Sequence, residues 1–410
     1  MARIFPDFVE GVIRVVGDHS RAPQIYTRWA AMSIIAGALG RKYWYDAGSY
    51  QIRPNLFIML VGGPGAGKGT SLIIPYEHIY RGLANRPGVR SDQEGYNPAV
   101  ESFGLDDAPP YIIWSRVTPE RLGVDIRSCQ HVDPFLSTPT GGLFYNSSVT
   151  VAVRELGNFL SRSDAYLQTF ITDMWDSPQD YDYRTKTAGI YYLQGPCLNW
   201  IACTTPSQFV DNMPESARGQ GLLSRIIPIY YDGENIKDDI KYSKPLAVGI
   251  QNLRDDLAEI AKIRGPVAFD PAFEATARAE VQGGLARRPS EALFAEYNTR
   301  RVTHLLKIAI VLAAGRLTKP IITEEVWLLS KAMLFEYEAK MPEVVKFFGL
   351  GKAGQISQTL IEFVSNINGK IPLAVFKREI LRRVNTPGEV DATFKAIMDT
   401  NLIRAEGVHI

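Results

Sequence analysis

One stretch decides the fold: NLFIMLVGGPGAGKGT, residues 55–70. Residues 55–61 form a β-like run that is apolar from Leu56 onward, which is typical of a buried β-strand. Residues 62–70 are rich in glycine, and residues 71–83 have a composition that suits a helix. Strand, glycine-rich loop and helix in this order predict an α/β fold in which the loop joins the end of a strand to the start of a helix.

The glycine-rich loop matches the pattern of a phosphate-binding loop, or P-loop, at Gly62, Gly67 and Lys68. Glycines let backbone N–H groups turn toward phosphate oxygens, and the lysine reaches the β- and γ-phosphates of a nucleotide. The pattern departs at Gly69, where a hydroxyl usually holds Mg²⁺, and the hydroxyl comes one place later at Thr70. A glycine-rich turn without a ligand is the alternative. We predict an ATP and Mg²⁺ site, and its expected nucleotide contacts are Gly62, Gly63, Pro64, Gly65, Ala66, Gly67, Lys68, Gly69 and Thr70.

Length and composition set the limits of the interpretation. The chain has 410 residues, of which 46% are hydrophobic, so it is long enough for two or three domains with a large core. Its net charge of +1 gives no global basic field, although a ring-shaped motor can concentrate positive charge in its channel. Three cysteines without metal-binding spacing, the lack of a membrane-spanning run and an N-terminus without an apolar core predict a cytoplasmic protein with no membrane contact.

Two later apolar runs end in side chains that suit nucleotide chemistry. Residues 149–155 end in Glu155, a carboxylate that can polarise the attacking water or hold Mg²⁺ together with Thr70. Arg154 stands where such a strand usually has another acid. The run that begins at Leu198 ends in Thr204 and Thr205, whose hydroxyls suit a sensor of the γ-phosphate. The alternatives are a strand that ends in a surface glutamate and a simple Thr-Pro turn.

Basic residues mark three further places in the chain. Arg184 and Lys186 lie at the polar turn of a predicted hairpin, residues 181–193, where they contact a DNA phosphate backbone or are merely solvated. Arg225 precedes a predicted strand and suits an arginine finger that reaches a neighbouring subunit's phosphate. Arg300 begins an apolar helical stretch and suits a lid residue that folds over the γ-phosphate. A surface salt bridge or a solvated charge pair is the alternative for the last two.

The order of predicted elements divides the chain into four parts. Residues 1–50 form a helical segment packed on the core, residues 51–235 the nucleotide-binding core and residues 236–348 a helical lid. Within the core, residues 129–142 read as a loop because they contain two prolines and two glycines. Residues 355–410 predict a winged helix, which docks on DNA or on a protein. Its expected elements are helices at residues 357–367, 374–383 and 387–400 and a terminal hairpin at residues 402–410.

This ordered set of motifs resembles the AAA+ helicases of phages, plasmids and integrated elements. In layout it is similar to the minichromosome-maintenance and superfamily 3 helicases. The resemblance covers roughly residues 20–350 and implies an α/β P-loop NTPase (AAA+-like) core with an α-helical lid, followed by the C-terminal winged-helix domain. It also implies the following roles: phosphate binding for Lys68, catalytic acid for Glu155, sensor 1 for Thr204 or Thr205, an arginine finger in trans for Arg225, sensor 2 for Arg300 and a pore hairpin for Arg184 and Lys186.

The function implied by the resemblance is an ATP-dependent DNA translocase or helicase of a phage or another mobile genetic element that acts in DNA replication. A finger acting in trans implies a ring, expected to be a hexamer, with single-stranded DNA in its channel. A primase or other replication proteins are the expected partners, in a bacterial or virus-infected cytoplasm. Two alternatives are a nucleoside monophosphate-type kinase, which the loop GGPGAGKGT also resembles, and a nucleotide-gated DNA-binding or packaging ATPase without helicase activity.

Overall fold

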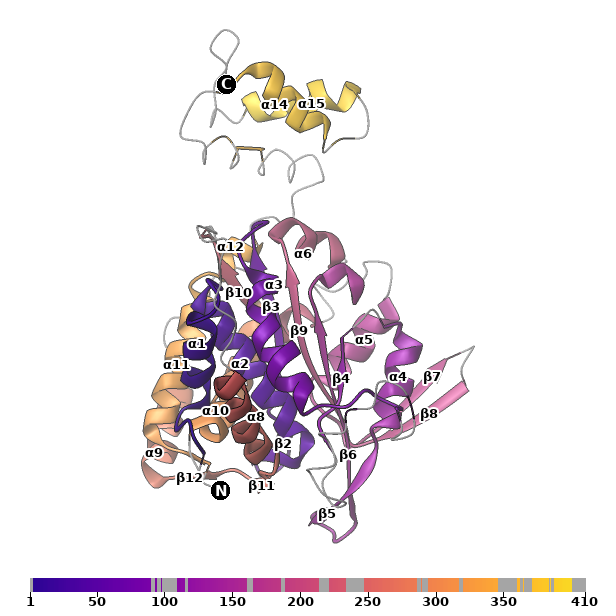
Figure 1. Cartoon of the computed structure of the whole chain (residues 1–410), viewed down its shortest axis with the longest axis vertical. Coiled ribbons are helices and arrows are strands. Elements are labelled where there is room, and N and C mark those ends of the chain that lie inside the picture. Colours follow the sequence, from indigo (N-terminus) through magenta and orange to yellow (C-terminus); the bar gives the residue numbers. More distant parts are fainter. Residues whose placement is uncertain are drawn as a thin grey trace. The chain divides into compact units, whose positions relative to one another are not determined.

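The computed structural model divides the chain into two compact units, Met1–Val344 and Val345–Ile410 (Figure 1). Its described residues are 3–89, 93, 97, 109–114, 117–160, 165–185, 189–213, 221–233, 247–285, 289, 294–316, 320–345, 360–361, 364, 371–382, 384 and 387–399. Within these ranges, no helix is both long and apolar enough to cross a membrane.

A mostly parallel β-sheet forms the centre of the first unit. Its strands follow one another across the sheet in the order β10 (Ile227–Tyr231), β3 (Phe57–Gly62), β9 (Pro196–Thr204), β6 (Leu143–Val153) and β4 (Ile112–Ile113). Each of these strands is parallel to its neighbour, and β5 (His131–Ser137) pairs antiparallel with β6. Within this sheet, β3 and β4 follow each other in the sequence, but β9 and β6 lie between them in space. The predicted α/β class is confirmed at this level.

Strands β3 and β9 are continuous apolar runs because both of their faces are covered. Every residue of the two strands is buried. Asn199 donates a hydrogen bond to the Ser33 carbonyl oxygen of the helix on one face, at 3.0 Å. Trp200 points to the other face, where its ring lies 5.8 Å from Phe57 and 5.1 Å from Phe159 between centroids. The apolar pattern predicts both strands correctly.

The prediction of a loop over residues 129–142 is wrong. Residues 131–137 form β5, and β6 begins at Leu143, so the two strands make a hairpin that closes near Gly141. Pro134 lies in β5, which pairs on one side only, and an edge strand tolerates the missing N–H of proline. The register shift between Val132 and Ser137 accommodates the same residue.

Helices surround the sheet and fill the rest of the first unit. In chain order they are α1 (Phe8–Gly17), α2 (Gln24–Leu39), α3 (Lys68–Leu72), α4 (Pro119–Ser128), α5 (Ala165–Met174), α6 (Pro206–Asn212), α8 (Ala247–Ala261), α9 (Pro271–Gln282), α10 (Ala295–Arg316), α11 (Glu324–Glu338) and α12 (Met341–Val345). Helix α2 packs against β9, β3 and β10 and also touches α1, α8 and α10, which explains why it is apolar nearly all round. A π-helical stretch, Ile73–Ile79, continues α3.

Short strands tie the helical region to the N-terminal segment. Strand β1 (Tyr43–Asp46) pairs with β2 (Gln51–Ile52) and with β11 (Gly265–Pro266), and β12 (Ala268–Phe269) pairs with β13 (Ile321–Ile322). The backbone N–H groups of Ile4 and Phe5 each donate to Asp256 of α8, at 2.7 Å. Arg3 donates to the Ala314 carbonyl oxygen in α10 at 2.8 Å. The N-terminal helices, the sheet and the helices after it therefore form one compact body.

The second unit contains helices α14 (Leu373–Leu381) and α15 (Pro387–Asp399). They match two of the predicted helices, and they pack through a small apolar core that includes Phe376, Ile380, Val390 and Ile397. The predicted hairpin at residues 402–410 lies outside the described residues, as does most of the predicted helix at 357–367. The winged helix remains a prediction.

Candidate functional site

The glycine-rich loop connects β3, which ends at Gly62, to α3, which begins at Lys68. Gly65 and Gly67 have φ angles of +83° and +79°, a backbone conformation that favours glycine. Gly62 is required for a second reason: a Cβ atom there would lie 2.8 Å from the Tyr231 carbonyl oxygen of β10. No described atom lies within 4 Å of the place a Cβ would take at Gly63, so the loop is open on its outer side.

Lys68 points back into this loop. Its Nζ donates hydrogen bonds to the carbonyl oxygens of Gly62 and Gly63, at 2.7 and 2.6 Å. Burial lowers the pKa of the Lys68 ammonium. A negatively charged oxygen competes well with neutral carbonyls for an ammonium group. The Lys68 ammonium group therefore lies at the opening of the glycine-rich loop, where it can exchange the two carbonyl oxygens for phosphate oxygens.

The predicted threonines lie on the strand next to this loop. Thr204 ends β9 and is the register partner of Val61, one residue before the loop. Its side chain is buried, and its hydroxyl donates to the Thr205 carbonyl oxygen at 3.2 Å. Thr205 caps α6, because its hydroxyl accepts from the Gln208 backbone N–H at 3.3 Å. Of the two, Thr204 has the hydroxyl that is not committed to capping a helix.

Glu155 lies just after the carboxyl end of β6, which is the neighbour of β9 on the side away from β3. Strand β6 ends at Val153, which pairs with Ala202, so Glu155 comes level with Thr204. Its side chain is exposed. The structure therefore brings Lys68, Thr204 and Glu155 to the carboxyl ends of three adjacent parallel strands, where ligands bind in open α/β sheets.

The metal donors implied by the resemblance match this edge only in part. Thr70 and Glu155 offer two oxygen donors, but Arg154 forms an ion pair with Glu77 at the place expected for a further acid. Gly69 has no side chain, although a Cβ there would meet no atom within 4 Å. The described residues contain no group of three His, Cys, Asp or Glu side chains that could hold a metal ion. The side chains present do not fit the usual magnesium set.

Arg225 and Arg300 lie together at the amino ends of the strands, whereas the glycine-rich loop lies at their carboxyl ends. Arg225 directly precedes β10, whose first residue pairs with Ile58 and whose last pairs with Gly62. Four residue steps along a parallel strand span about 13 Å, so Arg225 is at least that far from the loop of its own chain. The two guanidinium groups are neighbours, because a Cβ atom at Gly221 would lie 2.7 Å from Arg225 Nη1 and 3.5 Å from Arg300 Nη2. Burial and, to a lesser extent, the positive charge of Arg225 lower the pKa of Arg300.

Arg225 is held by groups that leave it incompletely paired. It donates to the Gly221 carbonyl oxygen at 3.0 Å, pairs with Asp176 at 3.3 Å and lies 5.5 Å from the centre of the Trp175 ring. Its Nε is buried and has no hydrogen-bond partner among the described residues. Asp176 is itself 60% exposed, so this ion pair faces solvent on one side. The surface salt bridge considered for Arg225 is present.

Two buried bases beneath these arginines were not anticipated by the sequence analysis. His304 donates from Nε2 to the Ser224 carbonyl oxygen at 2.9 Å, and burial lowers its pKa to about 4. Lys307 donates to the Asn55 side-chain oxygen at 2.7 Å and to the Trp175 carbonyl oxygen at 3.1 Å. Burial lowers the pKa of Lys307 to about 7. Both side chains fasten α10 to the amino ends of the strands, which is a structural role.

The predicted hairpin is present as β7 (Asp180–Thr185) and β8 (Gly189–Gln194). Arg184 is 67% exposed and pairs with Asp182 at 3.0 Å. Lys186 lies outside the described residues. Only Gly195 separates β8 from β9, so the hairpin and Thr204 lie on one continuous stretch of chain.

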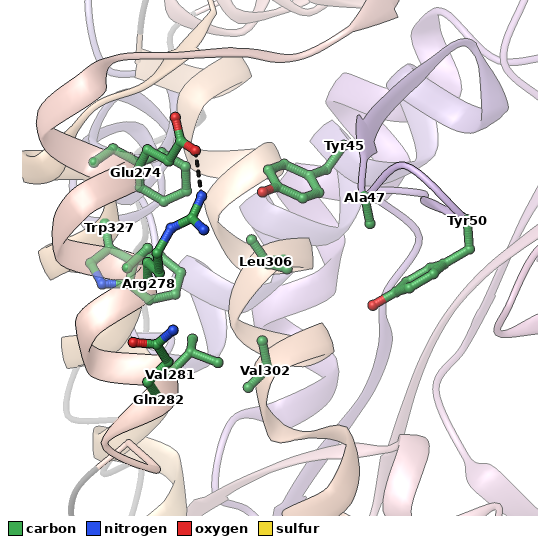
Figure 2. A pocket seen from close by; sticks show the side chains of 12 residues that line it. Tyr45, Ala47, Tyr50, Glu274, Arg278, Val281, Gln282, Val302, Leu306 and Trp327 are labelled. Atoms are coloured by element: carbon green, nitrogen blue, oxygen red, sulfur yellow. Dashed lines mark hydrogen bonds and ion pairs between the residues drawn. The ribbon is translucent and has the colours of Figure 1, made fainter.

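A pocket of about 410 Å³ lies elsewhere in the first unit (Figure 2). Aromatic and aliphatic side chains dominate its walls, and Glu274 accepts a hydrogen bond from Arg278 at its rim, at 2.7 Å. The lining residues are Tyr45, Ala47, Tyr50, Phe273, Glu274, Ala277, Arg278, Val281, Gln282, Val302, Leu306 and Trp327. None of the residues predicted for catalysis or nucleotide binding is among them.

The comparisons with known proteins give no family for this chain. No protein-family model matches it, and no curated protein matches it significantly.

Proposed function

We propose that the first unit binds ATP at the glycine-rich loop and hydrolyses it, as an AAA+-type ATPase. One observation carries the proposal most: Lys68, Thr204 and Glu155 come from separate parts of the sequence and meet at one edge of the sheet. Each belongs to a separate sequence motif. A glycine loop that served only as a turn would not require a polar hydroxyl and an acid on the two strands beside it.

Each residue would then have a distinct task. Backbone N–H groups of the loop and the Lys68 ammonium would bind the phosphates and offset their charge. Glu155 would polarise the attacking water, and the Thr204 hydroxyl would orient that water or contact the γ-phosphate. Thr70 and Glu155 remain the predicted oxygen donors for Mg²⁺. Because Gly69 and Arg154 do not match a magnesium site, no step is assigned to a metal.

The position of Arg225 supports assembly into a ring. An arginine at the amino ends of the strands cannot reach the loop of its own chain, whereas it can reach the loop of a second copy placed against that surface. Such a head-to-tail contact repeats around a closed ring. Arg300 lies beside Arg225 and would act from the same side, so the γ-phosphate that it contacts would also be that of the neighbouring copy. We retain a hexamer as the expected ring.

DNA is the proposed substrate of the motor. Arg184 is exposed on the hairpin formed by β7 and β8, which leads directly into β9, and Lys186 falls between β7 and β8 in the sequence. A change at Thr204 on phosphate release would thus be passed along one strand to the hairpin. Basic side chains on such a hairpin suit the phosphate backbone of single-stranded DNA. We therefore favour an ATP-driven DNA translocase or helicase acting in replication of a mobile element.

The first test is ATP binding and DNA-stimulated ATP hydrolysis by the full chain. Lys68→Ala should weaken ATP binding at least tenfold, because it removes the phosphate cation. Glu155→Gln should keep ATP binding and lower hydrolysis about a hundredfold or more, as expected for loss of a general base. Lys340→Ala, an exposed lysine paired with Asp232, is the matched control. Hydrolysis at the wild-type rate by Glu155→Gln would exclude the proposed chemistry.

A second candidate follows from Arg154. A site with an arginine in place of an acid suits a nucleotide-gated DNA-binding or packaging assembly that turns over slowly. ATP binding with DNA affinity that changes on binding, without strand separation, would favour this second candidate. Transfer of a phosphoryl group to AMP would instead favour the kinase alternative.

A further inference from the structure

Arg154 lies within the proposed ATP site rather than at its periphery. It follows the last residue of β6 and comes level with Cys203 of β9, which pairs with Leu60 of β3. Adjacent strands are about 4.8 Å apart, so Arg154 is two strand spacings from the strand that feeds the loop. Burial raises the pKa of the Cys203 thiol to about 12, and the positive charges of Lys68 and Arg154 oppose this rise. The positive charges of Lys68 and Arg154 are therefore both felt at Cys203, at the carboxyl ends of the strands.

The partner of Arg154 is Glu77, which lies in the π-helical stretch after α3. The ion pair thus joins the helix that follows the glycine loop to the end of β6. The Arg154 side chain is 50% exposed and that of Glu77 is 27% exposed. Ion pairs with this much solvent contact are weak, so another anion can displace the carboxylate.

Gly69 shows that the missing hydroxyl has no steric cause. A Cβ at that position would meet no atom within 4 Å, and the backbone there is not in the left-handed region. A serine would fit, yet the chain has glycine next to Lys68 and arginine next to Glu155. Both departures change the site in one direction, because one removes an oxygen donor for a cation and the other adds a cation.

We propose that Arg154 is a second phosphate-binding cation of this site, which exchanges Glu77 for the phosphate oxygens of a nucleoside triphosphate. The inference rests on the proposed function, because it requires that ATP binds at the loop. A guanidinium group forms two parallel hydrogen bonds to phosphate and keeps its charge at any physiological pH. Together with Lys68 it offsets charge that Mg²⁺ usually offsets. The site therefore binds metal-free ATP nearly as well as the magnesium complex.

Equilibrium binding of ATP to the full chain, measured by calorimetry in EDTA and in excess Mg²⁺, tests the proposal. The wild-type dissociation constants should agree within about threefold under the two conditions. Arg154→Ala should weaken binding in EDTA about tenfold or more, the size of one lost charge-assisted contact. Glu77→Gln should leave binding in EDTA unchanged or tighter, because it frees Arg154. Arg278→Ala removes another exposed arginine from an ion pair and is the matched control.

The double variant Gly69→Ser/Arg154→Asp restores the two missing groups and provides the sharper test. It should bind ATP only weakly in EDTA and regain affinity in Mg²⁺, so that its binding depends on the metal whereas that of the wild type does not. If the wild type itself needs Mg²⁺ and Arg154→Ala binds as well as wild type in EDTA, Arg154 is only the structural partner of Glu77 and the inference is wrong. Absence of ATP binding under both conditions would instead refute the proposed function, so the two failures are distinct. Thermal unfolding of each variant confirms that it is folded.

Discussion

Arg300 and Arg301 are adjacent on α10 but have different environments. Arg300 lies beside Arg225, while Arg301 is almost fully buried and forms a two-point ion pair with Glu338, at 2.6 and 2.7 Å. Tyr297 donates to the same carboxylate at 2.7 Å. A helix turns by 100° per residue, so neighbours in sequence point to different surroundings. The sequence marks a basic pair, and only the fold distinguishes the fully buried, structural Arg301 from the half-buried Arg300.

Removing the charge of Glu338 should be costly. Glu338→Gln leaves the Arg301 guanidinium buried without its counter-charge, and we expect a loss of about 3–5 kcal/mol in the free energy of unfolding. Urea denaturation monitored by tryptophan fluorescence measures this loss. Arg28→Gln breaks an exposed ion pair with Glu336 and should cost less than about 1 kcal/mol. Equal losses in the two variants would contradict the structural role of Arg301.

His304 should make the protein sensitive to mild acid. Burial lowers its pKa from an ordinary 6.5 to about 4, so the unfolded chain binds more protons than the folded one between these values. Its contribution is complete above pH 6.5 and is lost as the pH falls toward 4. Between pH 7.5 and 5, wild type should lose about 2 kcal/mol more stability than His304→Gln, which can still donate to Ser224. Urea titrations at the two pH values measure the difference, and parallel losses would contradict it.

At the scale of elements, the sequence predicts strands well where both faces are buried. β3 and β9 are continuous apolar runs, so their pattern has one interpretation. β5 fails because it pairs on one side only and contains Pro134, which local rules assign to a loop. The helices from α8 to α11 are recognisable because their caps are local, as at Thr323, whose hydroxyl accepts from Val326 N–H at 3.3 Å.

The sequence also predicts only the part of the candidate site that depends on local patterns. Lys68, Thr204 and Glu155 each follow a local pattern, and parallel strands bring such ends together. The ion pair of Arg154 with Glu77 joins residues 77 positions apart and leaves no local trace. The separation of Arg225 from its own loop likewise depends on strand register, which sequence spacing does not specify.

The hairpin formed by β7 and β8 should decide the response to DNA. Arg184→Ala/Lys186→Ala should reduce the stimulation of ATP hydrolysis by single-stranded DNA at least fivefold while the basal rate is unchanged. The hairpin carries no residue of the proposed ATP site, so basal turnover has no reason to fall. Binding curves at several salt concentrations provide a second readout, because losing two phosphate contacts lowers the salt dependence by a slope of about 1.4 for single strands. Unchanged stimulation would remove this hairpin from the DNA path.

At the scale of the whole molecule, the active unit is proposed to be an assembly. Lys68→Ala retains Arg225, and Arg225→Ala retains the glycine loop, so each variant should be inactive alone. When equal amounts mix at random, about a quarter of the interfaces combine an intact loop with an intact arginine. The mixture should therefore recover measurable hydrolysis, which a colorimetric phosphate assay detects.

Two controls make the mixing experiment decisive. Size-exclusion chromatography shows whether each variant assembles, and a mixture with Glu155→Gln/Arg225→Ala in place of Arg225→Ala should recover nothing. If the mixture is no more active than its components although both assemble, Arg225 does not act on a neighbouring loop.

The hydrogen bonds of residues 3–5 have a consequence for biosynthesis. Arg3 contacts a carbonyl oxygen 311 positions later in the chain, and Ile4 contacts Asp256. A ribosome adds residues in order, so these contacts form only after α10 has emerged. Until then α2, which is apolar nearly all round, lacks most of the surfaces that cover it. We expect the first unit to fold late and slowly, with a need for chaperones during translation that a shorter, locally connected domain does not have.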